Sequence, residues 1–225
     1  MKGYLGAKNG SGVYQTIINL LPPHDTYIEL FLGTGAVMKR KAPASRQIGV
    51  DLNRECIDGF ESEYDVELLN VCAFDFMRSF DFSKSGRTVI YADPTYVRET
   101  RTSNARYKYE LTDQQHVELL DILESVDAFV LLSGYRNRIY ERLTWWSVDF
   151  QAMTRGGVRT ETIWCNFVPK DMHYHTFAGK NFTDRQRIQR KAARWALSYE
   201  KLPAGERAAI LSALLQVDSD LQNVK

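Results

Sequence analysis

Apolar runs recur along the first three quarters of the chain, with stretches of helical spacing between them. The runs cover residues 27–32, 47–52, 66–71, 88–92, 128–133, 148–153 and 160–167. The early runs are continuous and rich in β-branched residues, which is typical of parallel strands covered by helices on both faces. Helices are expected over residues 12–21, 35–41, 54–61, 112–125 and 138–143. This pattern predicts an α/β fold with a doubly wound sheet and helices on both of its faces.

Turn and capping residues support this order of elements. The segment that joins the last two runs contains Gly156-Gly157, which favours a β-hairpin and therefore an antiparallel final strand. Thr112 followed by Gln115 forms a capping-box pattern, so the helix over 112–125 has the clearest start.

The pattern changes after Pro169. Thr183 and Gln186 form a second capping-box pattern, and apolar residues follow at helical spacing as far as Tyr199. Four basic residues lie largely on other faces of this helix: Arg187, Arg190, Lys191 and Arg194. A second helix is expected over 204–217, with its apolar residues packed against the first helix or the main domain. The chain thus divides into a main domain, 1–169, and a basic helical extension, 170–225.

The composition is that of a globular protein. The chain has 225 residues, of which 44% are hydrophobic and 25% charged, and it can bury a sizeable core. Its longest apolar runs are too short to cross a bilayer, and the amino terminus lacks the apolar core of a secretory signal, so a cytoplasmic location is expected. Cys56, Cys72 and Cys165 are widely spaced, which favours reduced thiols over disulfides or a zinc site. No bound metal is expected.

The net charge of +1 gives no general argument for binding a polyanion, but the charge is unevenly distributed. Residues 180–201 contain seven basic and two acidic side chains, a local charge of +5. Residues 97–109 contain four basic and one acidic side chain, a local charge of +3. These two segments are the candidates for contact with nucleic acid.

Two short motifs follow predicted strands. The run at 88–92 leads into Asp93-Pro94-Thr95-Tyr96, where an acid, a free carbonyl and an aromatic ring can hold the amino group of a flat heterocycle. The run at 27–32 leads into Gly33-Thr34-Gly35, a turn that lets a nucleoside ligand approach the backbone. Asp51 ends the next strand, where its carboxylate could accept hydrogen bonds from ribose hydroxyls. Together these motifs predict a cofactor site beside a base-binding site.

In these motifs the chain resembles the Dam-like adenine-N6 DNA methyltransferases of bacteria and phages. Five pieces match in the family's order over roughly residues 2–167: Gly6-Ala7-Lys8, Glu29 to Gly35, Asp51, Asp75-Phe76, and Asp93 to Tyr96. The resemblance implies a Rossmann-like class I methyltransferase sheet. Thr95 departs from the family, which has a second proline at this position; that change puts the rigidity of the motif in doubt, since proline restricts both itself and the residue before it.

The resemblance implies S-adenosylmethionine as the cofactor. The residues implied to bind it are Lys8, Glu29, Phe31, Gly33, Thr34, Gly35, Asp51, Asn53, Asp75, Phe76 and Asp93. Lys8 would hold the methionine carboxylate and Glu29 its ammonium, although Glu29 also fits a buried acid that needs a partner. Asp75-Phe76 would contact the cofactor's adenine, with a loop acid and a core phenylalanine as the alternative. Asn53 also fits the cap of the next helix.

The implied catalytic residues are Asp93, Pro94 and Tyr96. The Asp93 carboxylate and the Pro94 carbonyl would each accept one N–H of the target amine, which directs the nitrogen lone pair at the methyl group. Tyr96 would stack on the base after it leaves the duplex. Positioning and charge stabilisation would then supply most of the lowering of the barrier.

Contact with DNA is assigned mainly to basic and aromatic residues outside the strands. The candidates are Arg98, Arg101, Arg106, Tyr107, Lys108, Tyr135, Arg187, Arg190, Lys191 and Arg194. The family places a recognition insert between its Asp-Phe and Asp-Pro-Pro-Tyr motifs, but here only residues 77–92 separate them. Recognition would therefore fall to residues 97–111 or to the basic extension, because Arg reads guanine edges and Tyr stacks or wedges.

The sequence is thus interpreted as an S-adenosylmethionine-dependent enzyme that methylates adenine N6 in DNA, as in phage or restriction-modification methylation. Methylation of adenine N6 in RNA is an alternative that the tetrapeptide does not exclude. Another alternative is a nucleic-acid-binding homologue with weak catalysis, which Thr95 keeps open. Transfer to cytosine N4 is less favoured because that chemistry usually accompanies Ser in place of Asp93.

Overall fold

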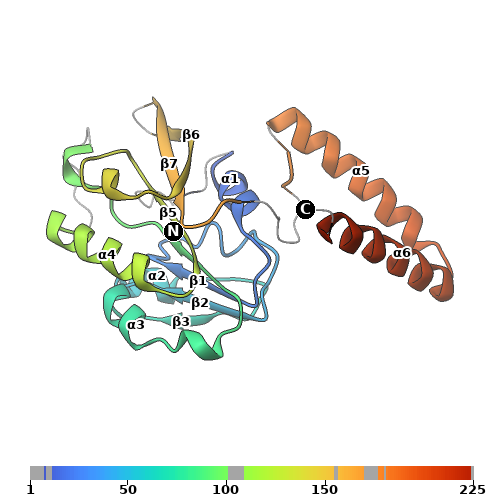
Figure 1. Cartoon of the computed structure of the whole chain (residues 1–225), viewed down its shortest axis with the longest axis horizontal. Coiled ribbons are helices and arrows are strands. Elements are labelled where there is room, and N and C mark those ends of the chain that lie inside the picture. Colours follow the sequence, from blue (N-terminus) through green and yellow to red (C-terminus); the bar gives the residue numbers. More distant parts are fainter. Residues whose placement is uncertain are drawn as a thin grey trace. The chain divides into compact units, whose positions relative to one another are not determined.

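The computed structural model describes residues 8, 12–100, 109–154, 157–169, 177–179 and 181–223. The chain forms two compact units, Met1–Phe177 and Ala178–Lys225. The first unit contains the sheet and the second contains two helices (Figure 1).

Within the described residues, the first unit is built on one seven-stranded sheet. Its strands are β1 (Thr26–Leu30), β2 (Arg46–Val50), β3 (Glu67–Leu69), β4 (Thr88–Ala92), β5 (Phe129–Gly134), β6 (Trp146–Thr154) and β7 (Gly157–Cys165). The strand order is β3-β2-β1-β4-β5-β7-β6, and the first five strands are parallel. β7 runs antiparallel to both β5 and β6. The predicted Rossmann-like class I methyltransferase sheet, with an antiparallel final strand, is confirmed.

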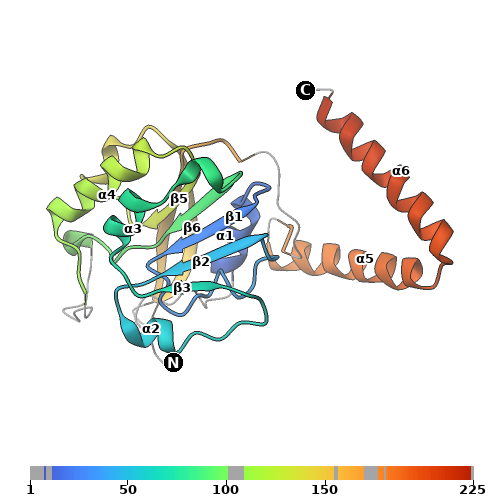
Figure 2. The ribbon, with the colours of Figure 1, turned by 90° about the horizontal axis from the view of Figure 1, so that it is seen from below.

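Helices lie on both faces of this sheet, as the continuous apolar strands predicted. They are α1 (Val13–Leu20), α2 (Arg54–Asp58), α3 (Ala73–Ser79) and α4 (Asp113–Ser125). Figure 2 shows α3 and α4 over the same part of the sheet. They share one buried apolar cluster with residues such as Ile28, Leu30 and Val130, while α1 belongs to a second cluster with Tyr27, Val89 and Leu131. Neighbouring residues of one strand therefore enter different clusters, as expected for a sheet buried on both faces.

Two helix starts agree with the sequence. Thr112 caps α4, because its hydroxyl accepts a hydrogen bond from the backbone N–H of Gln115 and the Gln115 side chain contacts the Thr112 backbone in return. Asn53 caps α2 by accepting from the N–H of Glu55, which confirms the capping alternative for this residue.

Two predicted helices are replaced by turns in the structure, and one helix was not predicted. Residues 36–40 form turns instead of a helix, because the N–H of Met38 donates to the Glu29 carboxylate and not to the carbonyl four residues before it. The prediction over 138–143 reduces to a single 3₁₀ turn, Tyr140–Arg142. Conversely, α3 was not predicted; it contains the Asp75-Phe76 pair, so the alternative of a loop acid does not hold, because Asp75 lies in the first turn of a helix.

The second unit consists of α5 (Phe182–Glu200) and α6 (Ala204–Asn223), joined by a short turn. The Tyr199 hydroxyl donates a hydrogen bond to the carbonyl of Arg207 at 2.9 Å, which links the two helices. Trp195 is 61% exposed, and the apolar residues of α6 that were expected to pack are also exposed: Ile210, Leu211, Leu214 and Leu215. Within the second unit these side chains are therefore not buried, and their expected packing against the main domain stays a prediction.

Two expectations from composition can be compared with the structure. Cys56, Cys72 and Cys165 are all free thiols, as predicted. In the described part of the chain, no helix is both long enough and apolar enough to span a membrane.

Candidate active site

Polar residues gather where the parallel strands end. Leu30, the last residue of β1, pairs with Val50 of β2 and with Ala92 of β4, and Ala92 pairs with Leu132 of β5. The residues that come next on these four strands are Phe31, Asp51, Asp93 and Ser133. They therefore lie at one edge of the sheet, which is where open α/β sheets bind their ligands.

The loop after β1 has an unusual backbone. Phe31, Gly33 and Gly35 have φ values of 58°, 53° and 61°, in the left-handed region. A Cβ atom on Gly35 would lie 2.2 Å from a ring carbon of Phe60, so only glycine fits at this turn. The turn at the carboxyl ends of the strands thus depends on glycines that the sequence had marked for the cofactor.

Asp51 connects this loop to the end of β2. Its carboxylate accepts hydrogen bonds from the N–H groups of Gly33 and Asn53, each at 2.7 Å. Burial raises the pKa of Asp51 above its ordinary value, although these two N–H groups oppose the change. Each carboxylate oxygen has a second lone pair for a further donor. The donor and acceptor chemistry of Asp51 therefore fits a ribose with two hydroxyl groups.

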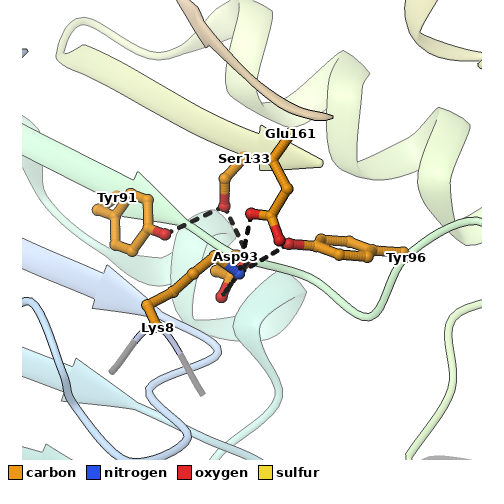
Figure 3. Close-up of polar contacts among 6 residues, drawn as sticks. All are labelled: Lys8, Tyr91, Asp93, Tyr96, Ser133 and Glu161. Carbon is orange, nitrogen blue, oxygen red and sulfur yellow. Dashed lines mark hydrogen bonds and ion pairs between the residues drawn. The ribbon is translucent and has the colours of Figure 1, made fainter. Parts of the chain in front are cut away.

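Asp93 stands at the centre of a cluster of polar side chains (Figure 3). Its two oxygens each accept a hydrogen bond from the Lys8 ammonium at 2.7 Å, and Oδ1 also accepts one from the Ser133 hydroxyl at 2.7 Å. Lys8 donates a third hydrogen bond to the Tyr96 hydroxyl at 2.7 Å. Behind Ser133, its hydroxyl lies 3.1 Å from the hydroxyl of Tyr91. The cluster brings together the predicted residues Lys8, Asp93 and Tyr96.

The electrostatics of the cluster keep Lys8 charged and Tyr96 neutral. Burial alone would lower the pKa of Lys8, but the carboxylates of Asp93 and Glu161 outweigh it and raise the pKa well above its ordinary value. Burial, followed by the negative charges of Asp93 and Glu161, raises the pKa of Tyr96 as well. Lys8 therefore acts in this cluster as a cation and Tyr96 as a phenol.

Glu161 is a member of this cluster that sequence reasoning missed. It lies on β7, one residue from Thr162, which pairs with Gly134 at the end of β5. Its side chain is 7% exposed, and its Oε2 atom lies 3.8 Å from the Lys8 nitrogen. The only available indication in the sequence was that Glu161 is the single acid in the apolar run over 160–167.

An aromatic pair borders the cluster. The rings of Tyr96 and Tyr135 meet edge to face with centroids 4.6 Å apart, and the Arg159 guanidinium lies 4.9 Å from the centroid of the Tyr135 ring. Beside this pair lies an open groove of about 480 Å³. Its lining residues are Glu99, Thr100, Tyr135, Arg136, Thr160 and Thr162. The groove reaches the cluster through Tyr135, whose ring contacts that of Tyr96, and the sequence alone did not indicate it.

Glu29 lies below the glycine loop. Its side chain is 3% exposed, and its Oε2 atom accepts hydrogen bonds from the Met38 N–H at 2.8 Å and from the Tyr27 hydroxyl at 3.1 Å. Burial raises the pKa of Glu29 to about 8, against the effect of these two hydrogen bonds. These contacts match the alternative of a buried acid that has found partners.

The Asp75-Phe76 pair is divided between surface and core. The Asp75 side chain is 76% exposed and forms an ion pair with Arg78 at 3.5 Å, whereas Phe76 is 7% exposed and packs in the core cluster against Phe80. An exposed carboxylate on the first turn of α3 remains available to a ligand, while the ring of Phe76 contributes mainly to packing.

The candidates for nucleic-acid contact fall into three groups. Arg98 is exposed, and Tyr135 lines the groove. Arg101, Arg106, Tyr107 and Lys108 lie outside the residues that the structure describes. On α5, four basic side chains are exposed: Arg187, Arg190, Lys191 and Arg194. Arg187 forms an ion pair with Asp184 at 2.8 Å, whereas Arg190 is 3.4 Å from the neutral Gln186 side chain.

Within the described residues, no three His, Cys, Asp or Glu side chains form a group that could hold a metal ion.

Comparisons with known proteins give limited information. No protein-family model matches the chain, and no curated protein does. Among solved structures, a conserved hypothetical protein of Streptococcus pyogenes has a TM-score of 0.45 and 18% identity, covering 72% of this chain and all of the other. The 23S rRNA methyltransferase ErmE has a TM-score of 0.42 and 8% identity, covering 79% of this chain and 72% of the other. A SAM-dependent methyltransferase from Agrobacterium tumefaciens has a TM-score of 0.41 and 15% identity, with coverages of 68% and 60%. Similarities this weak identify neither a family nor a substrate.

Proposed function

We propose that this protein is an S-adenosylmethionine-dependent methyltransferase that acts on the N6 amino group of adenine in DNA. The observation that carries the proposal is the position of Asp93 within its tetrapeptide. Its carboxylate, 15% exposed, stands at the carboxyl edge of the sheet next to Tyr96 and in register with Asp51 and the glycine loop. This arrangement sets an acceptor for an amine beside a site with the chemistry for a nucleoside.

The cofactor would bind along the ends of β1 and β2. The Asp51 carboxylate would accept hydrogen bonds from the ribose hydroxyls while it continues to hold Gly33 and Asn53. The left-handed backbone of residues 31–35 would let the methionine part approach the chain closely. Asp75, which is exposed at the start of α3, would contact the cofactor's adenine.

Asp93 and Pro94 would bind the target amine. The Asp93 carboxylate accepts one N6–H and the Pro94 carbonyl accepts the other, which holds the nitrogen in the pyramidal geometry that exposes its lone pair. S-adenosylmethionine supplies a sulfonium methyl group, which the nitrogen takes as the carbon–sulfur bond breaks and sulfur keeps the electron pair. The nitrogen then gives one proton to Asp93, from which it passes to solvent. The negative charge of Asp93 stabilises the positive charge that forms on the nitrogen.

The aromatic pair and the groove would hold the nucleic acid. A base inside a duplex cannot reach Asp93, so the target nucleotide has to leave the stack. Tyr96 would stack on the extruded base, and Tyr135, which contacts Tyr96, would support that ring. The neighbouring groove, with Arg136 in its lining, would receive the flanking backbone.

Methyl transfer from a labelled cofactor tests the proposal. The full chain is incubated with S-adenosylmethionine labelled in the methyl group and with duplex DNA or RNA in parallel, and the nucleosides are separated after digestion. We expect label in N6-methyldeoxyadenosine, and none with Asp93→Asn protein. Label only in RNA or only in cytosine would overturn the DNA-adenine assignment, and cofactor binding without any transfer would indicate a binding protein.

A further inference from the structure

Lys8 uses all of its hydrogen-bonding capacity on one side of the cluster. An ammonium has three N–H donors, and those of Lys8 go to Asp93 Oδ1, Asp93 Oδ2 and the Tyr96 hydroxyl. Glu161 lies on the other side (Figure 3), where Tyr96 forms a hydrogen bond with its side chain. The remaining oxygen, Oε2, is buried, has no hydrogen-bond partner and lies 3.8 Å from the Lys8 nitrogen.

A buried carboxylate oxygen without a hydrogen-bond donor raises the free energy of the folded protein. Burying an acceptor without a donor costs free energy, and more so when the acceptor is charged. The cluster also contains two carboxylates, Asp93 and Glu161, against the single ammonium of Lys8. The resting arrangement thus leaves one carboxylate oxygen, Glu161 Oε2, without a donor beside the ammonium, which points to a second arrangement of the same side chains.

The proposed chemistry requires such a second arrangement. Both oxygens of Asp93 are occupied by Lys8, and Oδ1 also accepts from Ser133. Oδ1 thus has both of its lone pairs in use, and the one lone pair left on Oδ2 belongs to a carboxylate whose charge the Lys8 ammonium already balances, so a target amine shares its acceptor with a cation. Lys8 can release an oxygen of Asp93 without a cost in free energy only if the N–H group that it frees finds another acceptor.

We infer that Glu161 is a positioning residue, which receives the Lys8 ammonium when the target amine takes its place on Asp93. This inference rests on the proposed function. In the resting protein Lys8 covers Asp93; in the complex with the target base it donates to Glu161 Oε2 while it keeps the Tyr96 hydroxyl. The step is a movement of a charged side chain, with no bond formed or broken.

The geometry makes this movement small. A charge-assisted N–H···O hydrogen bond is about 2.8 Å long, so the Lys8 nitrogen has to approach Oε2 by only about 1 Å from its 3.8 Å separation. Lys8 has a flexible four-carbon stem, whereas Glu161 is fixed on a strand that is paired on both sides, with β5 and with β6. The ammonium is therefore the part that moves and the carboxylate is the part that stays.

Replacement of Glu161 by Gln separates this role from a purely structural ion pair. In Glu161→Gln, Lys8 should remain on Asp93, because the amide is a weaker acceptor for an ammonium than the carboxylate. The kcat/KM for the methyl acceptor should fall by about 10-fold to 100-fold, with the Kd for S-adenosylmethionine unchanged. The thermal unfolding midpoint should be unchanged or higher, because an excess buried charge has been removed.

The matched control is Glu67→Gln. Glu67 also lies on a strand and also forms an ion pair, with Arg46 at 2.8 Å, but it is 45% exposed and belongs to β3. This variant should keep the wild-type kcat/KM. If Glu161→Gln keeps the wild-type kcat/KM and lowers the unfolding midpoint, Glu161 is structural and the inference is overturned.

A binding measurement tests whether Glu161 acts through the target amine. Duplex DNA is prepared with adenine or with purine, which lacks the amino group, at the position that the labelling experiment identifies, and its Kd is measured with S-adenosylhomocysteine present. Wild-type protein should prefer adenine, and Glu161→Gln should lose most of that preference. In Lys8→Met protein, the Glu161→Gln change should have no further effect on the preference. A full effect in that background would overturn the coupling to Lys8.

Two further results keep the inference testable. If Glu161→Gln does not fold, Glu161→Asp, which keeps the charge but withdraws it from Lys8, should reduce kcat/KM in the same direction; wild-type kcat/KM in this variant would overturn the inference. If the wild-type protein methylates no nucleic acid, the proposed function fails by itself. The unfolding comparison still decides whether Glu161 stabilises the cluster, and a lower midpoint for Glu161→Gln would then reject the role described here.

Discussion

The Thr95 hydroxyl accepts a hydrogen bond from the backbone N–H of Leu111 at 3.0 Å. Thr95 stands where the Dam-like methyltransferases, which the chain resembles in its motifs, have a second proline, and Leu111 lies just before the helix α4. The hydroxyl therefore joins the tetrapeptide Asp93–Tyr96 to the far end of the basic segment 97–111. Proline at position 95 would supply stiffness but would have no acceptor for this N–H.

Substitutions at Thr95 should reveal this link. Thr95→Val keeps the shape of the side chain and removes the acceptor, so it should lower the free energy of unfolding by about 1 kcal/mol. Thr95→Ser keeps the hydroxyl and should have a smaller effect. Thr95→Pro should resemble Thr95→Val in stability, and its activity reports whether stiffness or the link to Leu111 matters more. Urea unfolding gives the free energies, and equal stability of the Val and wild-type proteins would show that the hydrogen bond contributes nothing.

The sheet could be predicted from the sequence because local pattern determines most of it. Continuous apolar runs, a Gly-Gly turn and capping residues such as Thr112 determine the structure of residues that are close to them in the sequence. The segment after Gly35 could not be predicted in this way. Its helical spacing is overruled by one distant contact, between the Met38 N–H and Glu29, and no local pattern contains that information.

The residues of the candidate site also divide into those that a local pattern predicts and those that depend on distant contacts. Asp51 and Asp93 were accessible to sequence reasoning because each directly follows a strand, and parallel strands end at one edge. Glu161 was not, since it comes from the antiparallel strand β7 and reaches the cluster only through the pairing of Thr162 with Gly134. The burial of Glu161 beside Lys8 depends on the tertiary structure, and no motif in the surrounding sequence indicates it.

Asp93 and Asp51 should differ in their effects on activity. Asp93→Asn removes the charge that faces the target amine, so kcat should fall by about 100-fold or more while the Kd for S-adenosylmethionine changes little. Asp51→Asn replaces an oxygen that accepts from Gly33 or Asn53, so cofactor affinity should weaken by about 10-fold. Calorimetry gives the affinities and single-turnover methylation gives the rates. Equal loss of cofactor affinity in both variants would contradict the division of roles.

The buried pair Glu29 and Lys41 should make stability depend on pH. Burial raises the pKa of Glu29 to about 8, so its contribution to stability is complete below its ordinary value of 4.5 and is lost as the pH rises through 8. Burial lowers the pKa of Lys41 to about 7, so its contribution is complete above 10.5 and is lost as the pH falls through 7. Between pH 4.5 and 7 only the contribution of Glu29 changes, and stability should decrease with rising pH.

Glu29→Gln isolates this dependence. The amide oxygen can still accept from the Tyr27 hydroxyl and the Met38 N–H, but the group no longer titrates. As the pH rises from 5 to 7, the unfolding free energy of the wild type should therefore fall relative to that of Glu29→Gln, by up to about 1.4 kcal/mol per pH unit. Urea unfolding at pH 5, 6 and 7 measures this difference. A constant difference would mean that Glu29 is ionised throughout.

The basic face of α5 should contribute to nucleic-acid binding and not to methyl transfer. Arg190, Lys191 and Arg194 are exposed, and none of them forms an ion pair with an acidic side chain in the described part of the chain, so their charges are available to phosphates. Each phosphate contact releases counterion, and replacing all three residues by Gln should lower the slope of log affinity against log salt by up to about three units. Cofactor affinity and the unfolding midpoint should stay at wild-type values.

A matched variant gives this experiment its control. Arg54→Gln removes one exposed basic residue that is already paired with Asp58 at 2.9 Å, and it lies on α2 in the first unit. It should leave the salt slope unchanged, because its charge is already balanced by a neighbour. DNA is titrated at several salt concentrations with each protein. If the triple variant keeps both the wild-type affinity and the wild-type slope, α5 is a structural helix, and residues 97–111 become the main candidate for holding the substrate.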